Sequence, residues 1–199
     1  MLLMMKVELD LITDLEMLEM IEKMKRGGLC FVGSERHVKA NNHYLEYYDK
    51  TKPENYFLYE DANNLYGWAM RQLLPYINLK FNDQVQLEDI LNTRDDNTFG
   101  YYVECDLEYP EDLHDKFKEF PPCPESLTPK EEWLSDFQKD IMKQNKTKPS
   151  KCSKLIPHLM KHEKYVIHYR NLKYIQQLAV KVTEVHSCLL YTSPSPRDS

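Results

Sequence analysis

The spacing of apolar residues predicts a helix over residues 13–25. Four apolar side chains recur there at helical intervals and would line one buried face: Leu11, Leu15, Leu18 and Ile21. Thr13 and Glu16 have the spacing of a capping box, in which each side chain accepts a hydrogen bond from a backbone N–H of the first turn. Gly27 and Gly28 follow, and we expect them to end the helix in the left-handed conformation that glycine tolerates.

Alternation of apolar and polar residues over 99–109 predicts a half-buried strand. One face of this strand would carry Tyr102, Glu104 and Asp106, and the other Val103, Cys105 and Leu107. Residues 131–145 are compatible with a helix, Tyr165 to Tyr169 with a short strand, and Asn171 to Val182 with a helix. Five prolines over residues 110–130 predict an irregular connection between these elements.

The most informative segment runs from Tyr56 to Met70. Its aromatic, apolar first part has the character of a strand and ends at the carboxylate of Asp61. A Leu-Tyr-Gly turn containing Tyr66 follows, and helix-forming residues come next. We therefore expect Asp61 at the end of a strand, where a carboxylate can hold a divalent metal ion against a phosphate.

Composition limits the classes of protein that remain. A hydrophobic content of 42% and an aromatic content of 12% indicate a packed core. The net charge of −6 argues against nucleic-acid binding by this segment alone, since such domains usually carry a basic face. The sequence predicts no membrane span and no secretory signal. Its cysteines are scattered without a C-x-x-C pair, so we expect no disulfide framework and an intracellular location.

Four blocks, in order, resemble the family B DNA polymerases, in particular the protein-primed branch of Polinton/Maverick-type transposons and related viruses. Asp61 to Tyr66 resembles the D-x-x-x-L-Y element, and Gly100 to Pro110 resembles a palm strand of that group. Lys164 to Leu172 resembles the K-Y-V-h-H-Y-R-N-L segment that precedes the fingers. The triplet Arg26, Gly27 and Gly28 resembles the Y-x-G-G element that touches template DNA, with Lys25 at the tyrosine position.

This resemblance implies a DNA-directed DNA polymerase that joins deoxynucleotides to a primer 3′-hydroxyl with two Mg²⁺ ions. Asp61 would be the catalytic metal ligand, and the carbonyl of Ala62 would lie at the triphosphate. Tyr66 would pack under the incoming sugar and obstruct a 2′-hydroxyl. Partners would be template and primer DNA, a deoxynucleoside triphosphate and a terminal priming protein, at a nuclear or viral replication site.

The implied fold class is α+β, with a partial antiparallel palm sheet and helices on one side. The sheet would contain the Asp61 strand and the strand at residues 99–109. Four regions are expected: a helix and linker at 1–30, a partial palm at 31–110, an insertion preceding the fingers at 111–187, and a tail at 188–199. Residues 188–198 match a translated transposase sequencing adapter, so we expect the natural sequence to stop near Ser187.

Two motifs of this family do not occur before Ser187: the K-x-x-x-N-S-x-Y-G helix and the Y-x-D-T-D-S hairpin with the second metal carboxylate. We therefore expect this chain to be an inactive fragment. Alternatives are a truncated transposon remnant that at most binds a partner, and an unrelated α+β binding module. Glu104 and Asp106 are expected on a solvated strand face rather than in a metal site with Asp61. Three histidines are expected to be ordinary core or surface residues: His158, His162 and His168.

Overall fold

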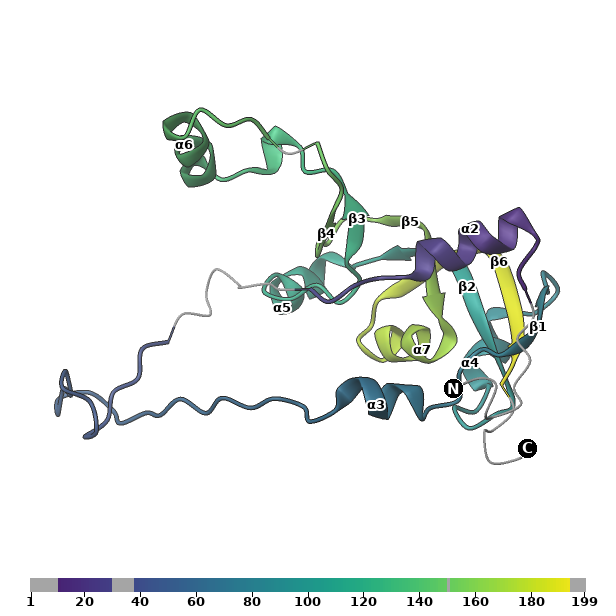
Figure 1. Ribbon diagram of the computed structural model, residues 1–199, viewed down its shortest axis with the longest axis horizontal. Helices are drawn as coiled ribbons and strands as arrows, with labels where there is room; N and C mark the ends of the chain where they lie inside the picture. Colours follow the sequence, from purple (N-terminus) through teal and green to yellow (C-terminus); the bar gives the residue numbers. More distant parts are fainter. Residues whose placement is uncertain (1–10, 30–37, 150, 194–199) are drawn as a thin grey trace.

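The computed structural model describes residues 11–29, 38–149 and 151–193 of the chain. Its centre is a four-stranded antiparallel sheet in the order β1-β6-β2-β5 (Figure 1). The strands are β1 (Ile77–Phe81), β2 (Phe99–Glu108), β5 (His162–His168) and β6 (Lys181–Thr192). The α+β class predicted from the sequence is therefore confirmed. Within the described residues, no helix has the length and apolar character needed to cross a bilayer.

Helices cover both faces of this sheet, not one face as expected. The helix α2 (Leu15–Met24) lies on one face, where Met20 packs with Tyr102, Leu189 and other apolar side chains. The helices α4 (Leu87–Asn92) and α7 (Tyr169–Gln177) contribute Ile90 and Leu172 to the larger core on the opposite face. Both faces of β2 and β6 are consequently buried, which explains why β2 is apolar on more than alternate positions.

The predicted strand at residues 99–109 is confirmed as β2, with the predicted division of its faces. Val103, Cys105 and Leu107 lie in the core beside α7. Tyr102 packs on the side of α2, and Glu104 on that side forms an ion pair with Lys23 of α2 at 3.1 Å. Alternating side chains point to opposite faces of a strand, so the period of the sequence was sufficient to sort them.

The first helix is confirmed, but its buried face and its ends differ from the prediction. Leu11, Leu15 and Leu18 are exposed, and the side that packs on the sheet carries Met17, Met20, Ile21 and Met24. Asp14, rather than Thr13, is the N-cap, and its carboxylate accepts from the backbone N–H of Met17 at 3.0 Å. The helix ends at Lys25 in an extended conformation, and no described glycine has a positive φ. Gly27 and Gly28 therefore continue an extended segment. A single extended residue ends the helix without a left-handed turn.

The sheet crosses the boundary that the sequence analysis placed at residue 110. Between β2 and β5, the chain forms η1 (Glu111–Leu113), α5 (His114–Phe117), and a two-stranded ribbon of β3 (Glu125–Leu127) and β4 (Lys154–Ile156). A lobe with η2 (Glu131–Trp133) and α6 (Asp136–Gln144) extends from this ribbon (Figure 1). Because β2 pairs with both β5 and β6, the expected palm and insertion regions share one sheet.

The expected strand before Asp61 does not form, so the predicted placement of Asp61 in the sheet is wrong. Tyr56 to Asp61 lies in an arm that runs along one side of the molecule to the short helix α3 (Leu65–Met70) (Figure 1). Tyr59 is 94% exposed, and the segment has no strand partner within the described chain. A segment with the composition of a strand forms one only where a neighbouring backbone satisfies its N–H and C=O groups. Among the described residues, no such backbone pairs with this arm.

The last strand differs from expectation at both ends. The helix predicted to reach Val182 stops at Gln177, because Ala179 takes a positive φ of 68° and turns the chain into β6. At its other end, β6 continues through residues 188–192, and Cys188, Leu189 and Tyr191 are buried in the core. The tail expected to lie outside the fold thus supplies part of the central strand, because its apolar residues alternate in register with β2.

Gly100 in β2 gives a test of this packing. A Cβ added there would lie 2.6 Å from Tyr191 Cζ and 2.7 Å from Tyr169 Cε1, and both rings are buried. We expect Gly100→Ala to lower the free energy of unfolding by about 1–3 kcal/mol through overpacking. Gly28→Ala, where an added Cβ meets nothing within 4 Å, is the control for urea unfolding. Equal midpoints for the two variants would contradict the packing around Gly100.

Candidate functional site

The motif around Asp61 lies on the exposed arm. Asp61 and Ala62 are exposed, and Tyr66 on α3 is 87% exposed. Asn64 caps α3 in a left-handed conformation with φ of 52°, and its side chain accepts from the N–H of Gly67 at 3.3 Å. A Cβ on residue 67 would lie 2.5 Å from the Asn64 amide atoms, so the glycine of the Leu-Tyr-Gly turn has a structural role in this cap.

Arg26 is held against the folded body. Its guanidinium donates to the carbonyl oxygens of Val166 at 2.9 Å and Met24 at 3.2 Å. It also lies over the ring of Tyr165, 3.9 Å from the ring centroid. The backbone of Gly27 and Gly28, by contrast, is open, since an added Cβ would meet nothing within 4 Å.

One hollow brings the segment before Gly27 close to the helix that follows Asp61. Its walls include Arg26, Trp68 of α3, and Tyr102 and His168 of the sheet. Arg170 at the start of α7 lies on the same hollow. Two of the regions singled out in the sequence therefore share a surface, and that surface carries two guanidinium groups. Asp61, Ala62 and Tyr66 do not line it.

As expected, Asp106 does not join Asp61. It differs from the expectation in that it is not merely a solvated residue. Its carboxylate accepts from the backbone N–H of Lys164 at 2.9 Å and from His186 Nε2 at 2.6 Å, and Lys161 Nζ lies at 3.1 Å. The hydrogen bond from Lys164 and then that from His186 hold the pKa of Asp106 well below its usual range. With donors on both oxygens, this carboxylate joins β2, β5 and β6 rather than awaiting a ligand.

A second cluster involves two of the three histidines. The rings of His158 and His162 are stacked, with centroids 4.4 Å apart, and His158 Nε2 lies 3.1 Å from Glu125 Oε2. His168 lies elsewhere and bonds Tyr191 Oη. The sequence analysis missed Glu125, because it stands 33 residues before His158 and no local spacing connects the two. These three residues and the group around Asp106 are the candidate metal-binding groups in the described chain, and neither includes Asp61.

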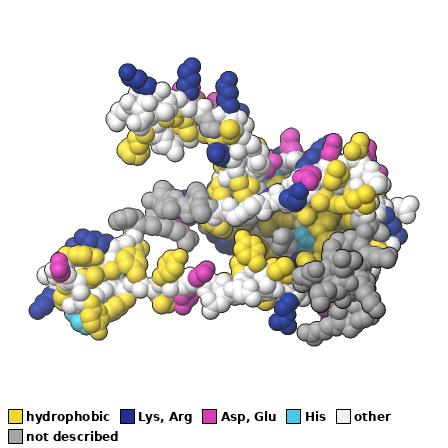
Figure 2. Space-filling model, viewed as in Figure 1, with side chains coloured by type: hydrophobic (Ala, Val, Ile, Leu, Met, Phe, Trp, Pro, Cys, Tyr) yellow, Lys and Arg dark blue, Asp and Glu magenta, His cyan; other side chains and the backbone are white. Residues whose placement is uncertain are grey.

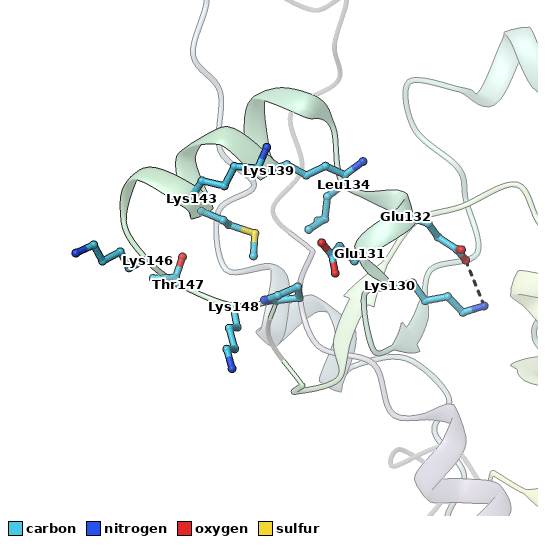
Figure 3. A pocket seen from close by; sticks show the side chains of 11 residues that line it. Lys130, Glu131, Glu132, Leu134, Lys139, Lys143, Lys146, Thr147 and Lys148 are labelled. Atoms are coloured by element: carbon cyan, nitrogen blue, oxygen red, sulfur yellow. Dashed lines mark ion pairs between the residues drawn. The ribbon is translucent and has the colours of Figure 1, made fainter.

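A lysine-lined hollow lies in the lobe around α6 (Figure 3). Lys143, Lys146 and Lys148 border it with Lys130 and Lys139, while Glu131 and Glu132 contribute opposite charge. Lys130 pairs with Glu132 at 3.7 Å, and Lys143 pairs with Asp140 at 3.4 Å. Lys139 pairs with Asp136 at 3.9 Å, so three of the five lysines are paired with acidic residues of the lobe.

Comparison with known proteins returned no matching family model, no matching curated protein and no matching solved structure.

Proposed function

We propose that this chain is a part of a protein-primed family B DNA polymerase, containing the first metal-binding motif of its palm. The supporting observation is the arm from Tyr56 to Asp61. It is extended and aromatic, and it lacks a strand partner in the described chain. Its apolar side chains are therefore largely exposed: Tyr56, Phe57, Leu58 and Tyr59. Such a segment fits a strand that pairs with further palm strands of a longer protein.

In that longer protein, the Asp61 carboxylate would bind Mg²⁺ at the end of the completed strand. The ion would orient the primer 3′-hydroxyl and the triphosphate for in-line attack, and it would stabilise charge on the attacking and leaving oxygens. The carbonyl of Ala62 would lie beside the triphosphate. Tyr66, the second residue of α3, would pack under the deoxyribose and obstruct a 2′-hydroxyl. A hairpin with a second carboxylate would pair with the arm and complete the metal site.

The ribbon of β3 and β4 and the lobe around α6 would then belong to the insertion that holds DNA and the priming protein. Five lysines around the hollow beside α6 can contact phosphates without reading sequence. Arg26 and Arg170 line the hollow beside α3, between the central sheet and the helix that follows Asp61.

The deciding experiment recovers the natural reading frame across Ser187 and Cys188 and assays the encoded protein by primer extension. We expect the frame to continue into an N-S-x-Y-G helix and a D-T-D hairpin. Asp61→Asn should then lower Mg²⁺-dependent incorporation about a thousandfold, because the ligand stabilises several kcal/mol of transition-state charge. The matched control is Glu60→Gln, a neighbouring exposed carboxylate outside the motif, which should retain activity.

The 199-residue chain itself should incorporate no nucleotide, because it lacks the second carboxylate. Incorporation by this chain that Asp61→Asn abolishes would contradict the fragment assignment. An immediate stop codon in the natural frame would favour the second candidate, a transposon remnant without catalysis. The isolation of Asp61 from every candidate metal group in the described chain favours that candidate.

A further inference from the structure

The cluster of Glu125, His158 and His162 joins three segments of the fold. Glu125 begins β3, His158 follows β4, and His162 begins β5 of the main sheet. The three side chains offer one ligand atom each, all within 4.8 Å of one another. Tetrahedral ligands at about 2.1 Å from an ion are about 3.4 Å apart, so this cluster needs to contract by roughly an ångström to hold one.

The hydrogen bonds of the two rings fix which nitrogen carries the proton. His162 Nε2 lies 2.7 Å from the carbonyl oxygen of Cys123, which can only accept, so Nε2 is the protonated nitrogen. His158 Nε2 likewise donates to the carboxylate of Glu125. Both rings therefore present an unprotonated Nδ1. A metal-bound histidine commonly has this arrangement, with its other nitrogen donating to a carbonyl, as His162 does to Cys123. The hydrogen bond from His158 to Glu125 has to break when both side chains bind the ion.

Both Nδ1 atoms are buried and have no hydrogen-bond partner. His162 is 0% exposed, and the side chain of His158 is 9% exposed. A buried acceptor without a partner is unfavourable, and two of them in rings stacked 4.4 Å apart indicate a missing ligand.

We propose that Glu125, His158 and His162 form a binding site for one divalent transition-metal ion, with Zn²⁺ the best chemical fit. Two imidazoles and a carboxylate are ligands that suit Zn²⁺. Mg²⁺ prefers oxygen ligands, so this site is separate from the one proposed at Asp61 and does not depend on it. The stacked rings of His158 and His162 rotate on binding until the Nδ1 atom of each ring points at the ion.

Charges around the cluster are compatible with a cation. The Glu125 carboxylate, with Oε2 3.1 Å from His158 Nε2, supplies negative charge to the cluster. Glu125 is partly exposed and borders a surface hollow, which gives the ion a path from solvent. The other candidate group is less suitable, because Lys161 Nζ already lies 3.1 Å from Asp106. An ion at Glu125 would fasten the β3-β4 ribbon to the start of β5.

The test is isothermal titration of Zn²⁺ into the full chain, purified without a histidine tag and stripped with a chelator. We expect one ion per chain, a rise in melting temperature, and the visible d–d absorption of a tetrahedral site with Co²⁺. His158→Gln should weaken Zn²⁺ binding more than 100-fold, and Glu125→Gln about 10- to 100-fold. Both side chains lie at the rim of the core, so these variants should fold even if a variant at the fully buried His162 does not.

The matched control is His186→Gln, which removes a histidine from the group around Asp106. It should leave the Zn²⁺ stoichiometry and affinity unchanged. Either of two results would overturn the proposal: no saturable binding by the unaltered chain, or binding that survives His158→Gln and is lost in His186→Gln.

Discussion

Removing residues 188–199 is expected to unfold the sheet. Leu189 is fully buried and Cys188 and Tyr191 nearly so, and β6 lies between β1 and β2. Loss of a buried leucine removes about 2–5 kcal/mol and loss of a buried aromatic side chain about 3–5 kcal/mol. The sum is of the same order as the whole stability of a domain, about 5–15 kcal/mol.

Circular dichroism during urea unfolding measures this effect, and a chain ending at Ser193 is the control. The control keeps all of β6, including Thr192 opposite Phe99, and should unfold cooperatively. The chain ending at Ser187 should show no cooperative transition, because β1 loses its pairs at Leu189, Leu190 and Thr192. Identical midpoints for the two chains would mean that residues 188–192 are not part of the folded sheet.

Acid is expected to destabilise the protein strongly between about pH 6.5 and pH 4. Burial, and then the charge of Arg170, lowers the pKa of His168 to about 4, and burial and His158 lower that of His162 to about 4. In this interval the unfolded chain binds more protons than the folded one, so stability falls as the pH falls. A change from 6.5 to about 4 corresponds to roughly 3 kcal/mol for each ring.

Asp106 extends the acid sensitivity to lower pH. Its pKa is lowered in the folded state, so its contribution is present above the ordinary aspartate value of about 3.9 and is lost as the pH falls below that value. The two histidines and this carboxylate therefore act in the same direction, in successive pH ranges.

Urea unfolding at a series of pH values from 7.5 to about 4, with a chelator present, measures the histidine contribution. His168→Gln should flatten the dependence by about half, since it leaves one buried histidine to titrate. His43→Gln, on the exposed arm, should leave the slope unchanged. A free energy of unfolding that stays constant between pH 6.5 and pH 4.5 would contradict the buried neutral state of both rings.

The exposed arm bears on how the chain behaves in solution. The large apolar side chains of Tyr56 to Tyr59 and of Trp68 are exposed, and Figure 2 shows hydrophobic side chains gathered along this arm. An unpaired apolar strand invites pairing with another chain. The same surface that fits missing palm strands in the proposed function would thus promote association of the isolated chain.

The helix α2 and the strand β2 could be predicted from the sequence because their patterns are local. Leu15, Leu18 and Ile21 repeat at the helical period, and Val103 to Leu107 alternates at the strand period. The first pattern predicted the helix but not its buried face, since Leu15 and Leu18 are exposed. The local pattern could not distinguish Asp14 from Thr13 as the N-cap, since both residue types cap helices well. Errors of one residue at a helix end are therefore expected from sequence alone.

The candidate sites divide in the same way. The resemblance of Asp61 and Tyr66 to a polymerase motif lies within one short segment and could be recognised without a structure. The cluster of Glu125, His158 and His162 could not, because β3, β4 and β5 bring its members together from distant positions. The pairing of β3 with β4 closes the separation of 33 residues between Glu125 and His158.

The sequence by itself determined the α+β class and the faces of β2, because these depend on residue type and local period. Only the tertiary structure decided that the run from Tyr56 to Asp61 stays unpaired and that residues 188–192 join the sheet. A strand exists only where another backbone satisfies its N–H and C=O groups. Whether a segment has such a partner depends on the arrangement of the whole chain.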